Sequence, residues 1–111
     1  MTTFDEREKA FEAKYRLDME TAFRINARRD KLLGYWLADK FGLSGADADA
    51  YARSVVEADF EEPGDNDVIR KVMKDCQERN LDISESALRQ EMDRLMAVAH
   101  QQILGEENSA S

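Results

Sequence analysis

The first 33 residues of this chain contain neither glycine nor proline, the two residues that most often interrupt a helix. Thr3 and Glu6 have the T-x-x-E spacing of a capping box, which predicts a helix start at Thr3. The helical pattern continues past Gly34 to about Phe41, and Gly42 is a suitable C-cap. A helix of this length is unusual in a small domain. We therefore expect its N-terminal third either to project beyond the core or to be ordered only part of the time.

Three shorter helices are predicted after this one. Ser44 opens a second capping-box spacing, and the helix it begins ends at Pro63-Gly64. Asp65 is expected to cap a third helix, and Ser84 a fourth that stops at Gly105. No segment shows the sustained apolar alternation of a strand. The fold is therefore predicted to be all-α, a small four-helix bundle with short connections between antiparallel neighbours.

Apolar residues at helical spacing give each predicted helix one face to bury. The expected core consists of Leu33, Trp36, Leu37, Tyr51, Val55, Phe60, Val72, Met73, Leu88, Met92 and Leu95. The chain then divides into three parts: an N-terminal arm over 1–18 that is partly disordered when free, a four-helix globular domain over 19–104, and a disordered tail over 105–111.

Length and charge exclude several classes of protein. The chain has 111 residues, with 24 acidic and 16 basic side chains and a net charge of −8, which argues against nonspecific binding to nucleic acid. Residues 1–41 hold 8 of the acids and 9 of the bases, a net of +1, so the remaining 16 and 7 give residues 42–111 a net of −9. No apolar run approaches the roughly 18 residues of a membrane span. One cysteine fits a reducing compartment.

No catalytic, metal or cofactor constellation stands out. A run of carboxylates without intervening bases does not follow the spacing of a calcium loop, so we interpret it as a solvated helix end; it comprises Glu57, Asp59, Glu61, Glu62, Asp65 and Asp67. His100 lacks a partner for base catalysis, and Cys76 lies on an apolar stripe as a small core residue does. Neither common phosphate-binding glycine motif occurs, although nucleotide contact by another route stays open. The sequence predicts a protein that is not an enzyme.

The N-terminal arm carries the clearest functional pattern. Phe4, Phe11 and Tyr15 are spaced by seven and four residues and so share one helix face. Acid–base pairs at i,i+4 around them stabilise the helix by roughly 0.2–0.5 kcal/mol each. This segment has too few apolar residues to hold itself in a core. The aromatics either anchor a helix in a partner's groove or fold back onto the bundle, and both remain open at this point.

Three segments carry a resemblance to a known family. They are FDEREKAFEAKY (Phe4–Tyr15), ARRDKLLGYW (Ala27–Trp36) and AYARSVVEADFEEPGDNDV (Ala50–Val68). In this order they resemble the zeta subunit, the ATPase inhibitor of alphaproteobacterial F-type ATP synthases, over about residues 3–104.

The resemblance implies a four-helix domain with an N-terminal inhibitory segment. In the family, that segment enters the interface between the alpha and beta subunits near the gamma stalk, forms a helix there and blocks rotation in the hydrolytic direction. Carried over to this sequence, the segment is about Thr2–Tyr15. The residues implied to make its contacts are the apolar anchors Phe4, Phe11 and Tyr15 and the polar Asp5, Arg7, Glu8, Lys9 and Lys14.

The rest of the chain, from about Arg28 onward, is implied to act as a bulky handle outside the catalytic head. The expected partners are the alpha, beta and gamma subunits, with no nucleic acid and no direct membrane insertion. The free protein is expected to be a monomer, cytoplasmic and peripheral to the inner membrane through the ATP synthase. The alternative is a small helical adaptor whose arm docks in the groove of another partner.

Overall fold

The computed structural model describes the backbone of residues 2–60 and 65–110 and the side chains of residues 19–60 and 65–106. Within this part of the chain there are four helices and no strands: α1 (Thr2–Lys40), α2 (Gly45–Asp59), α3 (Asn66–Glu78) and α4 (Glu85–Ala110). The predicted all-α, four-helix fold is confirmed. None of the described helices is apolar over a stretch long enough to cross a membrane.

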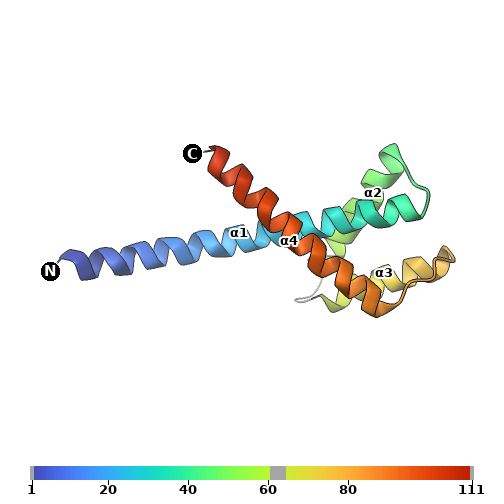
Figure 1. Ribbon diagram of the computed structural model, residues 1–111, viewed down its shortest axis with the longest axis horizontal. Helices are drawn as coiled ribbons and strands as arrows, with labels where there is room; N and C mark the ends of the chain where they lie inside the picture. The colour runs from blue at the N-terminus through green and yellow to red at the C-terminus, as the bar shows by residue number, and fades with distance from the viewer. Residues whose placement is uncertain (1, 61–64, 111) are drawn as a thin grey trace.

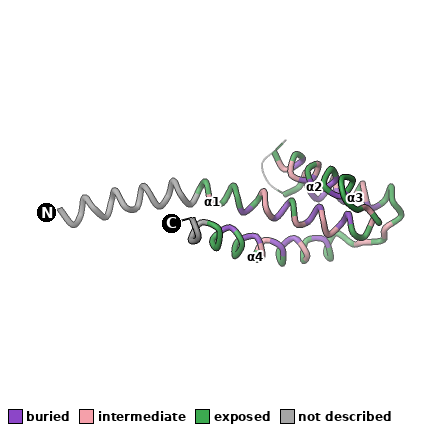
Figure 2. The backbone as a smooth tube through the Cα atoms, turned by 90° about the horizontal axis from the view of Figure 1, so that it is seen from above, coloured by how far each residue is buried: buried purple, intermediate pink, exposed green. Residues whose placement is uncertain are grey.

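The C-terminal half of α1 is the axis on which the other helices assemble. Both α2 and α4 pack on α1, and α3 completes the bundle by packing on α2 and α4 (Figure 1). The helix α4 runs back along α1 toward the N-terminus of α1 (Figure 2), and Arg28 of α1 donates to Gln102 and Glu106 of α4. With 39 residues, α1 is about 58 Å long at 1.5 Å per residue, so it extends well beyond the bundle.

Two groups of buried side chains hold the helices together. The larger lies where all four helices meet and consists of Leu33, Leu37, Ala38, Ala48, Tyr51, Val55, Val68, Ile69, Val72, Cys76, Leu88, Met92 and Leu95. The smaller joins α1 to α4 through Ile25, Ala99 and Ile103. Along the described part of α1, Ile25 is the first buried residue. Among the described residues, the core of the bundle therefore uses α1 from Ile25 onward.

Most of the predicted core is buried, as is confirmed for Leu33, Leu37, Tyr51, Val55, Val72, Leu88, Met92 and Leu95. Trp36 and Met73 are only half-buried and pack against the edge of the larger cluster. The prediction for Phe60 is wrong, because this side chain is 55% exposed. The last residue of α2 is Asp59, so Phe60 lies past the final turn of the helix and outside the space between the helices.

Some predicted helix ends are confirmed and others are not. The Oγ of Ser84 accepts a hydrogen bond from the Ala87 backbone N–H at 3.0 Å, the cap predicted for α4. Ser44 occupies the N-cap of α2 but makes no side-chain cap hydrogen bond. The predicted end of the last helix is wrong, since α4 continues through Gly105 to Ala110. A glycine weakens a helix by about 1 kcal/mol relative to alanine but keeps its backbone N–H, so it does not stop one.

Candidate functional site

The contacts predicted for the N-terminal arm belong to residues whose side chains lie outside the described part of the structure. These residues are Phe4, Asp5, Arg7, Glu8, Lys9, Phe11, Lys14 and Tyr15. The backbone that carries them is helical and continuous with the rest of α1. The structure describes side chains from Met19 onward, at the boundary predicted between the arm and the domain.

Large apolar side chains lie open to solvent at this junction. Met19 is 61% exposed and Phe23, one helical turn later, is 57% exposed. The ring of Phe60 stacks on that of Phe23, with centroids 5.3 Å apart and an interplanar angle of 13°. The residues from α1 and the end of α2 thus form one exposed apolar surface, which we call the junction patch (Met19, Phe23 and Phe60).

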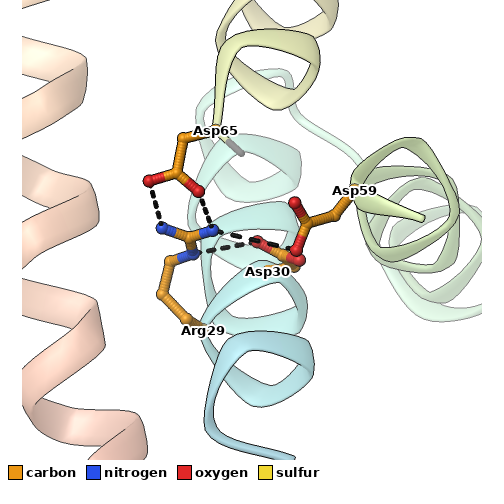
Figure 3. Close-up of polar contacts among 4 residues, drawn as sticks. All are labelled: Arg29, Asp30, Asp59 and Asp65. Carbon is orange, nitrogen blue, oxygen red and sulfur yellow. Dashed lines mark hydrogen bonds and ion pairs between the residues drawn. The ribbon is translucent and has the colours of Figure 1, made fainter. Parts of the chain in front are cut away.

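A buried cluster of charged side chains lies next to this patch. Arg29 and Asp30, adjacent on α1, are 2% and 0% exposed. The Arg29 guanidinium donates through Nε to Asp30 at 2.9 Å and through both terminal nitrogens to Asp65, at 2.8 and 3.3 Å. Asp59 at the end of α2 lies 3.9 Å from the same guanidinium. Figure 3 shows Asp65 on one side of Arg29 and the other two carboxyl groups on the other.

The protonation of Asp30 follows from its surroundings. Burial, aided by the neighbouring Asp59, raises the pKa of Asp30 to about 8, because the attraction of Arg29 offsets only part of the desolvation cost. Among the described residues, no donor reaches the buried Oδ2 of Asp30. A protonated Asp30 removes this deficit by donating to Asp59. Burial and the neighbouring Asp59 thus favour the protonated form of Asp30 near neutral pH.

The ion pair between Arg29 and Asp65 favours the charged form of both groups. Burial disfavours the Arg29 cation, but its hydrogen bonds to Asp65 and Asp30 and the negative charge of Asp65 hold the pKa of Arg29 above its usual value. The same hydrogen bond from Arg29 lowers the pKa of Asp65. Asp65 was expected to cap α3, yet it makes no cap hydrogen bond because its carboxylate binds Arg29 instead. The cluster thereby ties the end of α2 and the start of α3 to α1.

The cluster has a structural role, because it joins the end of α2 and the start of α3 to α1. Within the described residues, no group of three His, Cys, Asp or Glu side chains is placed to hold a metal ion. The run of acids that we interpreted as solvated is partly paired, since Asp59 and Asp65 face Arg29, while Glu61 and Glu62 lie outside the described residues. Cys76 is 1% exposed, and burial raises the pKa of its thiol, as suits a core residue rather than a nucleophile.

A second polar contact joins α2 to α3. The hydroxyl of Tyr51 donates to Asp75 at 2.8 Å, and Lys71 donates to the same oxygen at 3.0 Å. Burial raises the pKa of Tyr51, so the hydroxyl remains a donor throughout the physiological range. This contact satisfies a polar group at the edge of the core and places no reactive group at the surface.

Sequence reasoning missed the junction patch and the buried cluster. For Met19 and Phe23 a signal was present: with Phe11 and Tyr15 they form a series at four-residue intervals along one helix. For Arg29 and Asp30 no local signal existed, because a run of charged residues on a helix is usually solvated.

Comparison with known proteins identifies the family. The model of the family "ATPase inhibitor subunit zeta" matches residues 1–102. A structure described as "Solution NMR structure of the protein" is 46% identical to this chain, with a TM-score of 0.67, and the match covers 76% of this chain and 95% of the other. A search of curated proteins gave no match. With almost its whole length matched, the chain belongs to the ATPase inhibitor subunit zeta family, so it is a regulatory subunit that inhibits F-type ATPases and is not an enzyme.

Proposed function

We propose that this protein inhibits ATP hydrolysis by inserting the N-terminal part of α1 into the catalytic head of the F-type ATP synthase. The segment Thr2–Tyr15 enters the interface between an alpha and a beta subunit near the gamma stalk. There it acts as a wedge against rotation in the hydrolytic direction. The four-helix bundle stays outside the head.

The observation that carries this proposal is that α1 is longer than the part of it that contributes to the described core. This helix spans Thr2–Lys40, but the described part of the core uses α1 only from Ile25 onward. A helical segment that extends beyond its own domain is free to pack against a partner. The family match includes this segment, because it begins at residue 1.

The energetics are consistent with a helix that docks through aromatic anchors. Burying one aromatic side chain contributes roughly 1.5–3 kcal/mol. Phe4, Phe11 and Tyr15 together supply several kcal/mol toward ordering and placing the arm. The neighbouring Asp5, Arg7, Glu8, Lys9 and Lys14 supply polar contacts that orient it.

The proposal also assigns partners and a location. The alpha, beta and gamma subunits are the partners, and the protein lies on the cytoplasmic side, held near the inner membrane through the synthase alone. The chain has a net charge of −8, and residues 42–111 carry most of its excess of acids, which accords with a role of the bundle in orientation outside the head. The free protein is expected to be a monomer.

A hydrolysis assay with the purified catalytic head of the cognate enzyme tests the proposal. The full-length chain should inhibit, whereas a chain lacking residues 2–15 should not. Proton-driven ATP synthesis by the whole synthase should fall less than hydrolysis, since a directional wedge leaves the active site free. If the shortened chain inhibits as strongly as the intact one, the arm is not the inhibitory element. Capture of a different complex, without alpha and beta subunits, would support an adaptor instead.

A further inference from the structure

One face of α1 is covered by α2 only as far as α2 reaches. Gly34 lies against Ala52, Asp30 against Asp59, and Phe23 against Phe60. The two helices are antiparallel, so each successive contact lies nearer to the N-terminus of α1 and nearer to the C-terminal end of α2. One turn before Phe23, Met19 lies past the end of α2 and is 61% exposed. The apolar face of α1 thus continues beyond the helix that covers it.

The fourth helix does not cover this face either. It binds α1 through Ile25, in a cluster with Ala99 and Ile103, and through the Arg28 contacts with Gln102 and Glu106. Ile25 is two residues after Phe23, and residues two apart on a helix point in different directions. Within the described chain, the junction patch of Met19, Phe23 and Phe60 is therefore left open by both neighbours of α1.

The patch is also continuous with the arm. Phe11, Tyr15, Met19 and Phe23 follow one another at intervals of four residues along a single helix, and residues four apart lie one above the other. A partner surface that packs on Phe11 and Tyr15 and continues along the helix would next contact Met19 and Phe23. Phe60 then adds a ring from outside α1, held in place by stacking on Phe23.

We propose that the junction patch is the second half of the inhibitory contact, and that it binds an apolar surface of the catalytic head beside the site that accepts the arm. This inference rests on the proposed function. The two stacked aromatic rings present a large apolar area whose side chains are already ordered, a property of residues that dominate protein interfaces. The patch fixes how far the arm inserts, because Phe60 belongs to the bundle and stops it at the entrance.

The charges beside the patch indicate the chemistry of the partner surface. An exposed glutamate lies three residues before each phenylalanine, Glu20 before Phe23 and Glu57 before Phe60, and one exposed base, Arg24, follows Phe23. Neighbours at this spacing lie on the same side of a helix. An apolar surface edged by lysine or arginine complements this arrangement, so the contact made by the patch should weaken as salt rises.

The double variant F23A/F60A in the full-length chain tests the inference. Both side chains are more than half exposed, so the melting temperature should fall only by the few degrees that loss of their stacking costs. The concentration needed for half-inhibition of the catalytic head should rise about tenfold or more, as for loss of anchor residues. Leu104→Ala is the control, since Leu104 is an exposed apolar residue of α4 that does not belong to the patch, and it should leave inhibition unchanged.

Comparison with Phe11→Ala separates this inference from the proposed function. If Phe11→Ala weakens inhibition and F23A/F60A does not, the arm inhibits alone and the junction patch is not part of the contact. If F23A/F60A weakens inhibition but removal of residues 2–15 does not, the arm proposal fails instead. If the free protein sediments as a dimer and F23A/F60A makes it a monomer, the patch is a self-association surface and the inference is overturned.

Photo-crosslinking gives a readout that does not depend on the stability of the double variant. A benzophenone side chain replaces Met19 in the full-length chain, which is then bound to the catalytic head and irradiated. Attachment to an alpha, beta or gamma subunit supports the inference. A probe at position 19 that leaves the head unmodified, while the same probe at position 11 attaches, overturns it.

Discussion

Gly34 of α1 lies so close to Ala52 of α2 that a Cβ atom on the glycine would stand 2.4 Å from the Ala52 Cα. The atom it would meet is backbone, so no side chain can turn aside to make room. The glycine lets the two helices approach to backbone contact, and this approach brings the end of α2 against α1. The charged cluster and the Phe23–Phe60 stack both lie further along the same helix pair.

Gly34→Ala should therefore destabilise the domain. Alanine favours a helix over glycine by up to about 1 kcal/mol, but overpacking against backbone costs about 1–3 kcal/mol and in rigid places more. Urea unfolding should show a net loss of stability. Gly105→Ala is the control, because a Cβ there meets nothing within 4 Å. It should stabilise α4 by a few tenths to about 1 kcal/mol. Equal effects at the two positions would contradict the close crossing of α1 and α2.

Asp30 should make the domain less stable as pH rises. Its pKa of about 8 in the folded state lies above the ordinary 3.8 of the unfolded chain, so the folded state holds a proton that the unfolded state has lost. This contribution is complete below pH 3.8 and is lost progressively as pH rises toward 8, at up to about 1.4 kcal/mol per pH unit. Asp65, whose pKa is lowered, acts in the opposite sense and only at more acidic pH.

Asp30→Asn should flatten this dependence. Asparagine resembles the protonated acid, with an oxygen that accepts from Arg29 and an amide that donates to Asp59. Urea unfolding between about pH 5 and pH 8 should show a falling stability for the parent chain and a smaller slope for the variant. Asp39→Asn, at an exposed position on the same helix, is the control and should keep the parental slope. Parallel slopes for the parent chain and D30N would mean that Asp30 is ionised in the folded protein.

A substitution in the core should reduce the stability of the domain more than a substitution in the junction patch. Leu33 is 0% exposed in the larger cluster, and Leu33→Ala should cost about 2–5 kcal/mol through the cavity it leaves. Phe60→Ala removes more atoms but should cost about 1 kcal/mol, because its main loss is the stacking on Phe23. Thermal denaturation followed by circular dichroism compares the two. A larger loss from Phe60→Ala would show that this ring is covered in solution.

The helices and most of the core were predictable because they depend on local patterns. Spacing of apolar residues identified eight side chains that are buried, namely Leu33, Leu37, Tyr51, Val55, Val72, Leu88, Met92 and Leu95. Phe60 continues the same spacing, but burial also requires that another element lie opposite. Because α2 ends at Asp59, Phe60 lies outside the space between the helices.

The candidate site was less predictable because it depends on which helices meet. Arg28, Arg29, Asp30 and Lys31 form an unbroken run of charges, and only the positions of α2 and α3 determine that the middle two are buried. Asp65 had a good local role as a helix cap, but a charged partner across the bundle outcompetes a backbone N–H for its carboxylate.

Phe11→Ala and Tyr15→Ala should weaken inhibition without weakening the fold. The described core begins at Ile25, so we expect the packing of α1 on α2 and α4 to persist without either aromatic. Each truncation should raise the concentration for half-inhibition of the catalytic head about tenfold or more, because buried aromatic anchors dominate such contacts. The melting temperature should stay that of the parent chain. Lys31→Ala, at an exposed position on the same helix, is the control and should change neither quantity. If either aromatic variant instead lowers the melting temperature by many degrees, the arm folds back onto the bundle, and loss of inhibition would then report unfolding.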